Sequence, residues 1–109
     1  MCEFQSLYFD DDGYVLRCKD CNHYQVAFIS TILTLNEDNF QALCQLVKHN
    51  CNEPDYSFPE QNKSVVLQTP SNGICMLLTK LELKRFNKIL EEADNESKAL
   101  SLISLFNTP

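Results

Sequence analysis

Two cysteines are spaced so that one metal ion could bind between them. Cys18 and Cys21 form a Cys-x-x-Cys pair, and His23 follows two residues later. This spacing lets two thiolates from one turn bind a single tetrahedral ion, which is how proteins commonly hold zinc. A lone pair of this kind is a weak zinc signature, because a full site supplies both halves at fixed spacing. The other ligands must come from elsewhere in the chain.

The start of the chain is expected to supply a third thiolate. Two β-prone runs, residues 7–9 and 14–16, flank an acidic turn that ends in Gly13, and this pattern predicts a hairpin. Continuing the register away from the turn pairs Cys2 with Cys21. The Cβ atoms of directly opposed residues lie about 5 Å apart, so both thiolates could reach one ion.

The fourth ligand stays open among three residues. His23 adjoins the Cys-x-x-Cys pair, whereas His49 and Cys51 follow the first predicted helix and are candidates if that end returns to the pair. The sequence therefore predicts a structural, zinc-knuckle-like site formed by Cys2, Cys18 and Cys21 with His23 or Cys51. If the ion kept an open coordination position, the chain would instead be a small enzyme or a metal-handling protein.

Other uses of the cysteines are disfavoured. A redox-active Cys-x-x-Cys needs its first thiol at the N-terminus of a helix, where the dipole lowers its pKa, but β-like segments lie on both sides of this pair. Cys44 shares a helical face with Phe40, and Cys75 lies inside an apolar run at residues 74–78. We therefore assign both of these cysteines to the core.

Length, charge and hydropathy narrow the class of protein. The chain has 109 residues, which predicts one domain over residues 1–109, and its net charge of -6 argues against nucleic-acid binding. No apolar run approaches the roughly 20 residues of a membrane span, and the N-terminus carries no recognisable secretory signal. We expect a cytoplasmic protein, in a compartment where a close cysteine pair favours metal over a disulfide.

The elements that must position the cysteines form a first ββα unit over residues 1–49. After the hairpin, residues 24–35 are rich in Val, Ile, Thr and Phe, which predicts one long bent strand or two short ones. Asn36 is the expected N-cap of a helix that ends near Lys48 and His49. Apolar residues recur along this helix at a spacing that gives it one buried face.

A second ββα unit is predicted over residues 63–94. Its hairpin turns at residues 70–73, and Thr79 with Glu82 forms the capping box of a second helix. The two units together predict an α+β fold, with a mostly antiparallel sheet of four to six strands and helices on one face.

A C-terminal helix over residues 96–106 is expected to complete the fold, with Asp94 or Asn95 as its cap. This helix is apolar over more than one stripe, which is more than packing against a single surface requires. We expect it to contact either an unknown protein partner or a second copy of the chain.

The stretch from Arg17 to Phe28 reads RCKDCNHYQVAF. It resembles a family of small uncharacterised proteins of Bacteroidota, which have an N-terminal Cys, a Cys-x-x-Cys pair and a following Tyr/Phe-Gln-x-Ala-Phe strand. The resemblance covers about the first half of the chain and implies a bacterial cytosolic origin and the grouping of Cys2 with the pair. Its members tend to carry Gly after Ala-Phe, where this chain has Ile29. It implies no activity and no catalytic residue.

No catalytic constellation is recognisable in the sequence. The chain has no Gly-rich phosphate loop, no nucleophile elbow and no HExxH motif. We therefore predict a non-enzymatic binding module with a structural zinc-knuckle-like site, and keep a small enzyme or metal-handling protein with an open cysteine-ligated site as the alternative.

Overall fold

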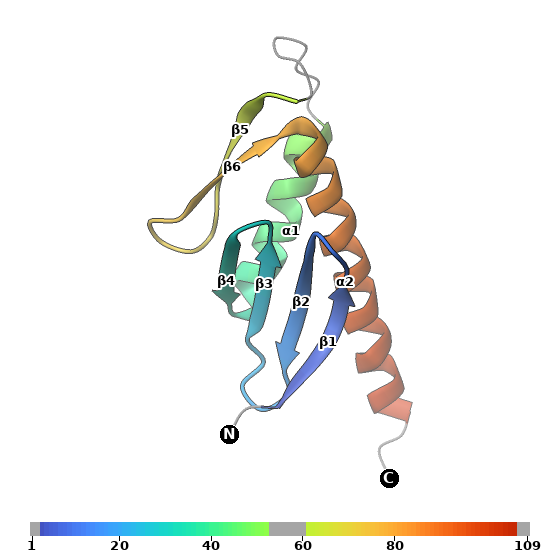
Figure 1. Ribbon diagram of the computed structural model, residues 1–109. Helices are drawn as coiled ribbons and strands as arrows, with labels where there is room; N and C mark the ends of the chain where they lie inside the picture. Colours follow the sequence, from blue (N-terminus) through green and yellow to red (C-terminus); the bar gives the residue numbers. More distant parts are fainter. Residues whose placement is uncertain (1–2, 53–60, 107–109) are drawn as a thin grey trace.

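The computed structural model describes residues 3–52 and 61–106, in which six strands combine with two helices (Figure 1). The strands are β1 (Phe4–Phe9), β2 (Gly13–Cys18), β3 (Tyr24–Phe28), β4 (Thr31–Leu35), β5 (Lys63–Gln68) and β6 (Cys75–Thr79). The helices are α1 (Glu37–Asn52) and α2 (Lys80–Phe106). The predicted α+β class is confirmed.

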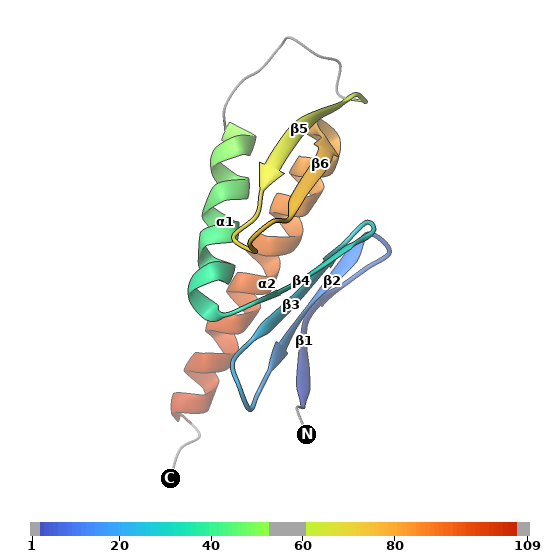
Figure 2. The ribbon, with the colours of Figure 1, turned by 90° about the vertical axis from the view of Figure 1, so that its left-hand side faces the viewer.

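The strands form two antiparallel sheets, a four-stranded sheet in the order β1-β2-β3-β4 and a hairpin of β5 with β6. Both helices lie on one face of the larger sheet (Figure 2). Each predicted unit consists of strands followed by a helix. The first unit has four strands, because residues 24–35 form two short strands, and the second has two. Ile29, at the turn between these two, has a φ of 56°, in the left-handed region that Gly adopts most easily.

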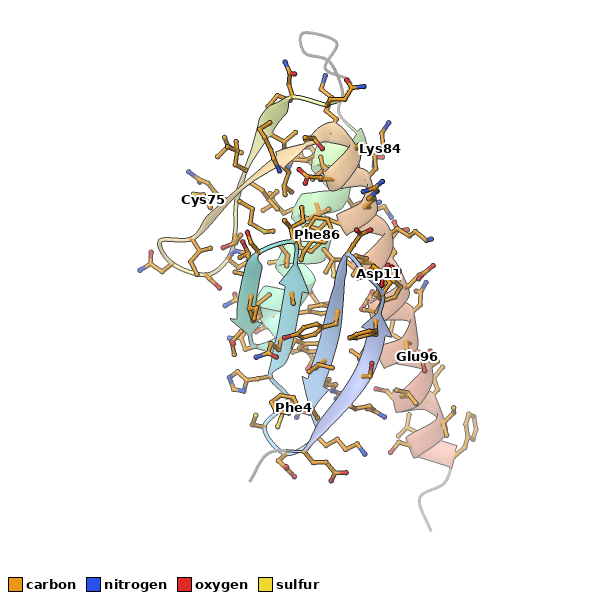
Figure 3. The ribbon with its side chains drawn as sticks, in the orientation of Figure 1. Phe4, Asp11, Cys75, Lys84, Phe86 and Glu96 are labelled. Atoms are coloured by element: carbon orange, nitrogen blue, oxygen red, sulfur yellow. The ribbon has the colours of Figure 1, made fainter. Side chains whose placement is uncertain are left out.

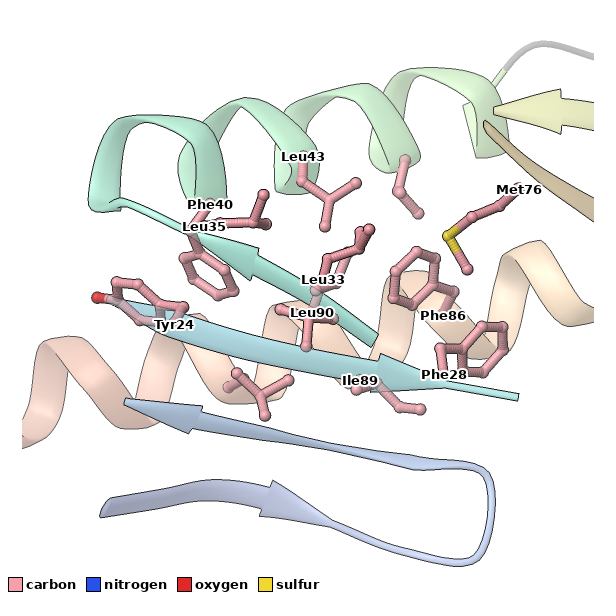
Figure 4. Close-up of a cluster of buried hydrophobic side chains, with 14 of the residues drawn as sticks. Tyr24, Phe28, Leu33, Leu35, Phe40, Leu43, Met76, Phe86, Ile89 and Leu90 are labelled. Carbon is pink, nitrogen blue, oxygen red and sulfur yellow. The ribbon is translucent and has the colours of Figure 1, made fainter. Parts of the chain in front are cut away.

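Two stacked pairs of aromatic rings join β3 to the helices. Tyr24 stacks on Phe40 of α1 with ring centroids 4.1 Å apart, and Phe28 stacks on Phe86 of α2 at 4.6 Å. All four rings are buried, and leucine side chains fill the space between the two pairs (Figure 4). Burial of each ring stabilises the fold by about 2 to 3 kcal/mol relative to leaving it in water.

The predicted hairpin of β1 and β2 is present, but its register is not continuous. A bulge at Leu7 shifts the pairing, so that Gln5 lies opposite Arg17. An uninterrupted register would have paired Gln5 with Cys18, and our extrapolation to the start of the chain is therefore wrong by one residue. The physical reason is burial, because the bulge turns Leu7 into the core instead of onto the face of the exposed Phe9.

Helix α1 begins where the sequence predicts and ends later. Asn36 is its N-cap, since the backbone N–H of Asn39 donates a hydrogen bond to Asn36 Oδ1 at 2.8 Å. The helix continues past the predicted end at His49 to Asn52. Cys51 therefore belongs to the helix, where it packs against the core.

Helix α2 begins with the predicted capping box. The N–H of Glu82 donates to Thr79 Oγ1 at 3.0 Å, and the N–H of Thr79 donates to Glu82 Oε1 at 2.8 Å. This reciprocal pair satisfies two backbone donors that the first turn of a helix would otherwise leave without partners.

The prediction of a separate C-terminal helix over residues 96–106 is wrong, because α2 runs without a break from Lys80 to Phe106. The expected cap, Asp94, accepts its hydrogen bonds from side chains. Its Oδ1 receives one from Gln41 Nε2 at 2.9 Å, and its Oδ2 receives one from Lys98 Nζ at 2.8 Å. Asp94 thus ties α2 to α1 and does not begin a new helix.

A substitution at the exposed Asn95 tests the continuity of α2. Inside a helix, Asn95→Ala should raise the free energy of unfolding by about 0.5 kcal/mol, because Ala has the higher helix propensity. If Asn95 were an N-cap, the same change would lower that free energy by about 1 kcal/mol. Urea denaturation followed by circular dichroism measures the sign of this change in the free energy of unfolding. As a control that breaks the helix at the same position, Asn95→Pro should lower that free energy by about 3 kcal/mol.

Candidate functional site

The Cys-x-x-Cys pair lies in the turn between β2 and β3, at the lower end of the sheet in Figure 1. We name residues 18–23 the cysteine turn. The N–H of Cys18 donates to the carbonyl of His23 at 2.8 Å, and the N–H of Asn22 donates to the carbonyl of Cys18 at 3.0 Å. Asn22 has a φ of 59°, a left-handed conformation that Asn tolerates well. These bonds bring Cys18 and Cys21 onto one closed turn.

The residue that precedes β1 is fastened to the cysteine turn. The N–H of Lys19 donates to the carbonyl of Glu3, and the N–H of Glu3 donates to Asp20 Oδ2, both at 2.9 Å. Lys19 Nζ and Glu3 Oε1 also form an ion pair at 3.6 Å, which contributes little to stability because both side chains are exposed. Cys2, the predicted third ligand, lies outside the described residues.

The side chains of the cysteine turn differ in exposure. Cys18 is buried and pairs with Phe4, whose side chain lies on the outer face of the sheet (Figure 3). Side chains alternate along β2, so Cys18 lies on the face opposite to that of Arg17, which reaches Ser97 of α2. Cys21 and His23 are exposed, and His23 Nδ1 lies 3.2 Å from the carbonyl oxygen of Cys21. Within residues 3–52 and 61–106, no three His, Cys, Asp or Glu side chains are grouped to hold a metal ion.

The other ligand candidates, His49 and Cys51, lie at the far end of α1. This helix begins just after Leu35, which pairs with Tyr24 beside the cysteine turn. A helix rises about 1.5 Å per residue, so Cys51 lies about 20 Å further along. Its thiol donates a hydrogen bond there to the carbonyl of Leu83, 3.5 Å away in α2. The structure does not bring His49 or Cys51 to the Cys-x-x-Cys pair.

The two cysteines assigned to the core have different environments. Cys44 packs against the core as predicted, and burial raises the pKa of its thiol to about 12. Cys75 is exposed, so its assignment to the core is wrong. The hairpin of β5 and β6 buries Met76 and Leu78 on one face, and the alternation along β6 turns Cys75 outward (Figure 3).

Arg17 links the cysteine turn to α2, which the sequence analysis missed. Its guanidinium donates a hydrogen bond to Asn22 Oδ1 at 3.2 Å and lies 3.5 Å from Ser97 Oγ. The guanidinium carbon lies 5.9 Å from the centre of the Tyr24 ring, whose hydroxyl is 3.2 Å from Ser97 Oγ. The sequence could have indicated that Arg17 points inward, because Arg17 follows the buried Val15 by two positions and alternate residues of a strand share a face.

The last turns of α2 pass beyond the start of α1 and diverge from the sheet (Figures 1 and 2). Ser97 is the last fully buried residue of the helix. After it come four exposed, large apolar side chains, which we name the α2 end: Leu102, Ile103, Leu105 and Phe106. Neither α1 nor α2, the helices of the described part of the chain, is long and apolar enough to cross a membrane.

A groove with a volume of about 330 Å³ lies beside the α2 end. Tyr24, Glu37 and Gln41 line it from β3 and α1, and Leu102 and Leu105 line it from α2. Polar and apolar groups therefore meet along this flank of the helix, and two residues of the α2 end belong to the groove wall.

Apolar residues also occur on the outer face of the larger sheet. Phe9, Tyr14, Ala27 and Ile32 pair in one row across its four strands. Antiparallel sheets commonly leave one face in water, and this row ends beside the acidic turn at residues 10–12. The α2 end differs from it because residues 99–106 carry no charge at all.

Comparison with known families places the chain beside proteins without an assigned role. A family of unknown function (DUF6686) matches residues 1–107. Searches among curated proteins and among solved structures found no match. The expected resemblance to an uncharacterised family is confirmed, and it extends over both halves of the chain.

The environments of Cys44 and Cys75 predict different thiol reactivity. Because burial raises the pKa of the Cys44 thiol to about 12, almost none of it is thiolate at pH 8, and its alkylation should accelerate as the pH rises. The exposed Cys75 should react with iodoacetamide many times faster in the native protein. Mass spectrometry of peptides after brief labelling measures both rates. Equal rates in the native protein would contradict the burial of Cys44.

Proposed function

The chain belongs to DUF6686, a family of unknown function, and we propose that it is a non-enzymatic module that binds another protein through the α2 end. The observation that carries this proposal is the exposure of four large apolar side chains on one short helical segment. Monomeric proteins rarely expose a contiguous apolar patch of this kind, and such patches mark interaction sites.

The length of α2 supports this proposal. The helix continues for nine residues beyond Ser97, its last fully buried residue, to Phe106. Helical turns without tertiary contacts are marginal in water, so helix propensity by itself gives this segment little stability. A partner that covered the α2 end would bury apolar side chains that are more than half exposed among the described residues.

Photocrosslinking in cells tests the binding surface. Benzoylphenylalanine in place of Phe106, which is 85% exposed, should give a protein adduct on irradiation. The matched control is the same probe in place of Phe9 on the outer face of the sheet, which is 77% exposed. If position 106 gave no more adduct than position 9, the α2 end would not be a binding surface and the proposed function would fail.

We also propose that the cysteine turn holds a structural zinc ion with Cys2, Cys18 and Cys21 as ligands. Two thiols on one closed turn are the donor set that zinc prefers. Glu3 is hydrogen-bonded to Lys19 and Asp20 of the turn. Cys2 precedes Glu3 in the sequence, which is why we propose its thiol as the third ligand.

His23 is the fourth ligand in this proposal. It belongs to the cysteine turn, whereas Cys51 is separated from the turn by most of the length of α1. His23 Nδ1 faces the carbonyl oxygen of Cys21 at 3.2 Å. A hydrogen bond from Nδ1–H to a backbone carbonyl is the arrangement that fixes a histidine with Nε2 available to a metal.

Metal analysis with a matched pair of cysteine variants tests the zinc site. Protein purified from zinc-supplemented cells without chelator should contain about one zinc ion per chain. Cys21→Ser should lose the ion, because it removes a thiolate ligand, and Cys75→Ser should retain it, because Cys75 is an exposed cysteine far along the chain. The proposal fails if the unsubstituted protein contains no stoichiometric metal, or if both variants bind equally.

Thermal unfolding gives a second measure of the same ion. An ion that binds the folded state alone stabilises it by about 2.7 kcal/mol at a hundredfold excess over Kd. For a domain of this size that corresponds to a rise in Tm of about 10 °C or more. A chelator should therefore lower the Tm of the unsubstituted protein and leave that of Cys21→Ser unchanged.

A further inference from the structure

We propose that the partner of the α2 end is a second copy of this chain, bound so that the two helices run antiparallel across a two-fold axis. This inference rests on the proposed function, because it uses the same surface. Three observations favour a second copy: the spacing of the apolar residues, the distribution of charge along α2, and the apolar area available.

Three residues of the α2 end, together with Ala99, repeat at the spacing of a helix–helix seam. Ala99, Leu102, Ile103 and Phe106 lie at positions i, i+3, i+4 and i+7, and all four are exposed. A two-fold axis between Leu102 and Ile103 pairs each of these two residues with the other. The same axis sets Phe106 of one copy against Ala99 of the second copy. The largest side chain thus meets the smallest, so the seam is complementary to itself.

The distribution of charge favours an interface at residues 99–106 and an antiparallel arrangement of the two helices. The chain has a net charge of -6, so two copies carry a net mutual repulsion, whereas residues 99–106 carry no charge. Glu92 and Glu96 lie one to two turns earlier on the face of Ala99 and Ile103. A parallel pair would set these carboxylates against their copies, and an antiparallel pair keeps them apart.

The available area matches what a small dimer needs. Leu102, Ile103, Leu105 and Phe106 are each more than half exposed. Complete burial of these four side chains in both copies would remove at most about 1,000 Å² from water, which is close to the lower bound for a specific interface. Leu102 belongs to both the seam and the wall of the groove beside α1, so a second copy on the seam would also cover one edge of that groove.

Sedimentation equilibrium of the purified 109-residue chain tests the dimer. At about 100 µM, well above the micromolar range expected of a small interface, the mass should approach twice the 12.6 kDa of one chain. Ile103→Glu places a charge in the centre of the seam and should raise the dissociation constant by about 30-fold or more. The matched control is Ile32→Glu on the outer face of the sheet, since Ile103 is 54% and Ile32 57% exposed.

Circular dichroism melting confirms that both variants fold, and Ile103→Ser replaces Ile103→Glu if the latter does not. A dimer that dissociates on substitution at Ile103 and persists on substitution at Ile32 supports the inference. A monomer at 100 µM, or equal weakening by both substitutions, overturns it.

The crosslinked adducts separate this inference from the proposed function. An adduct from position 106 with twice the mass of the chain and peptides of this chain alone supports the second copy. An adduct with a different protein, together with a monomer in sedimentation, overturns the dimer and leaves the proposed function standing. A monomer without an adduct above the level at position 9 overturns both.

Discussion

Strand β3 holds the molecule together, because its first and last residues each stack an aromatic ring on a different helix. Tyr24 meets Phe40 of α1, and Phe28 meets Phe86 of α2. β3 also pairs with β2 on one side and β4 on the other. Loss of either stack would leave a cavity between this strand and one of the helices.

The position of α2 decides which surfaces remain for function. Phe86 and the buried residues up to Ser97 hold the first two thirds of the helix against the sheets and α1. The remaining third has no sheet beneath it, since the helix diverges from β1 and β2 (Figure 2). The exposure of the α2 end is therefore a consequence of helix length, because the described strands and α1 do not extend far enough to bury its apolar side chains.

Arg17 connects the two regions to which we assign roles. Its guanidinium bonds to Asn22 in the cysteine turn and lies beside Ser97, two residues before Ala99. The same side chain covers the Tyr24 ring, which stacks on Phe40. The cysteine turn and the α2 end are thus attached to the same buried cluster, although they are far apart in the sequence.

Local patterns in the sequence were sufficient to predict the hairpins, the cap at Asn36 and the capping box at Thr79, because each depends on residues within a few positions of one another. They also predicted the Cys-x-x-Cys turn between two strands. The tertiary structure decided what depends on distant contacts. The burial of Leu7 creates the bulge that shifts the register toward Cys2. Asp94 accepts a hydrogen bond from Gln41 of α1 and lies within a helix that continues to Phe106. The length of α1 carries Cys51 away from the turn, and the single covered face of β6 exposes Cys75. In each case the outcome depends on which surface a residue meets in the folded chain, and neighbouring residues in the sequence do not determine that surface.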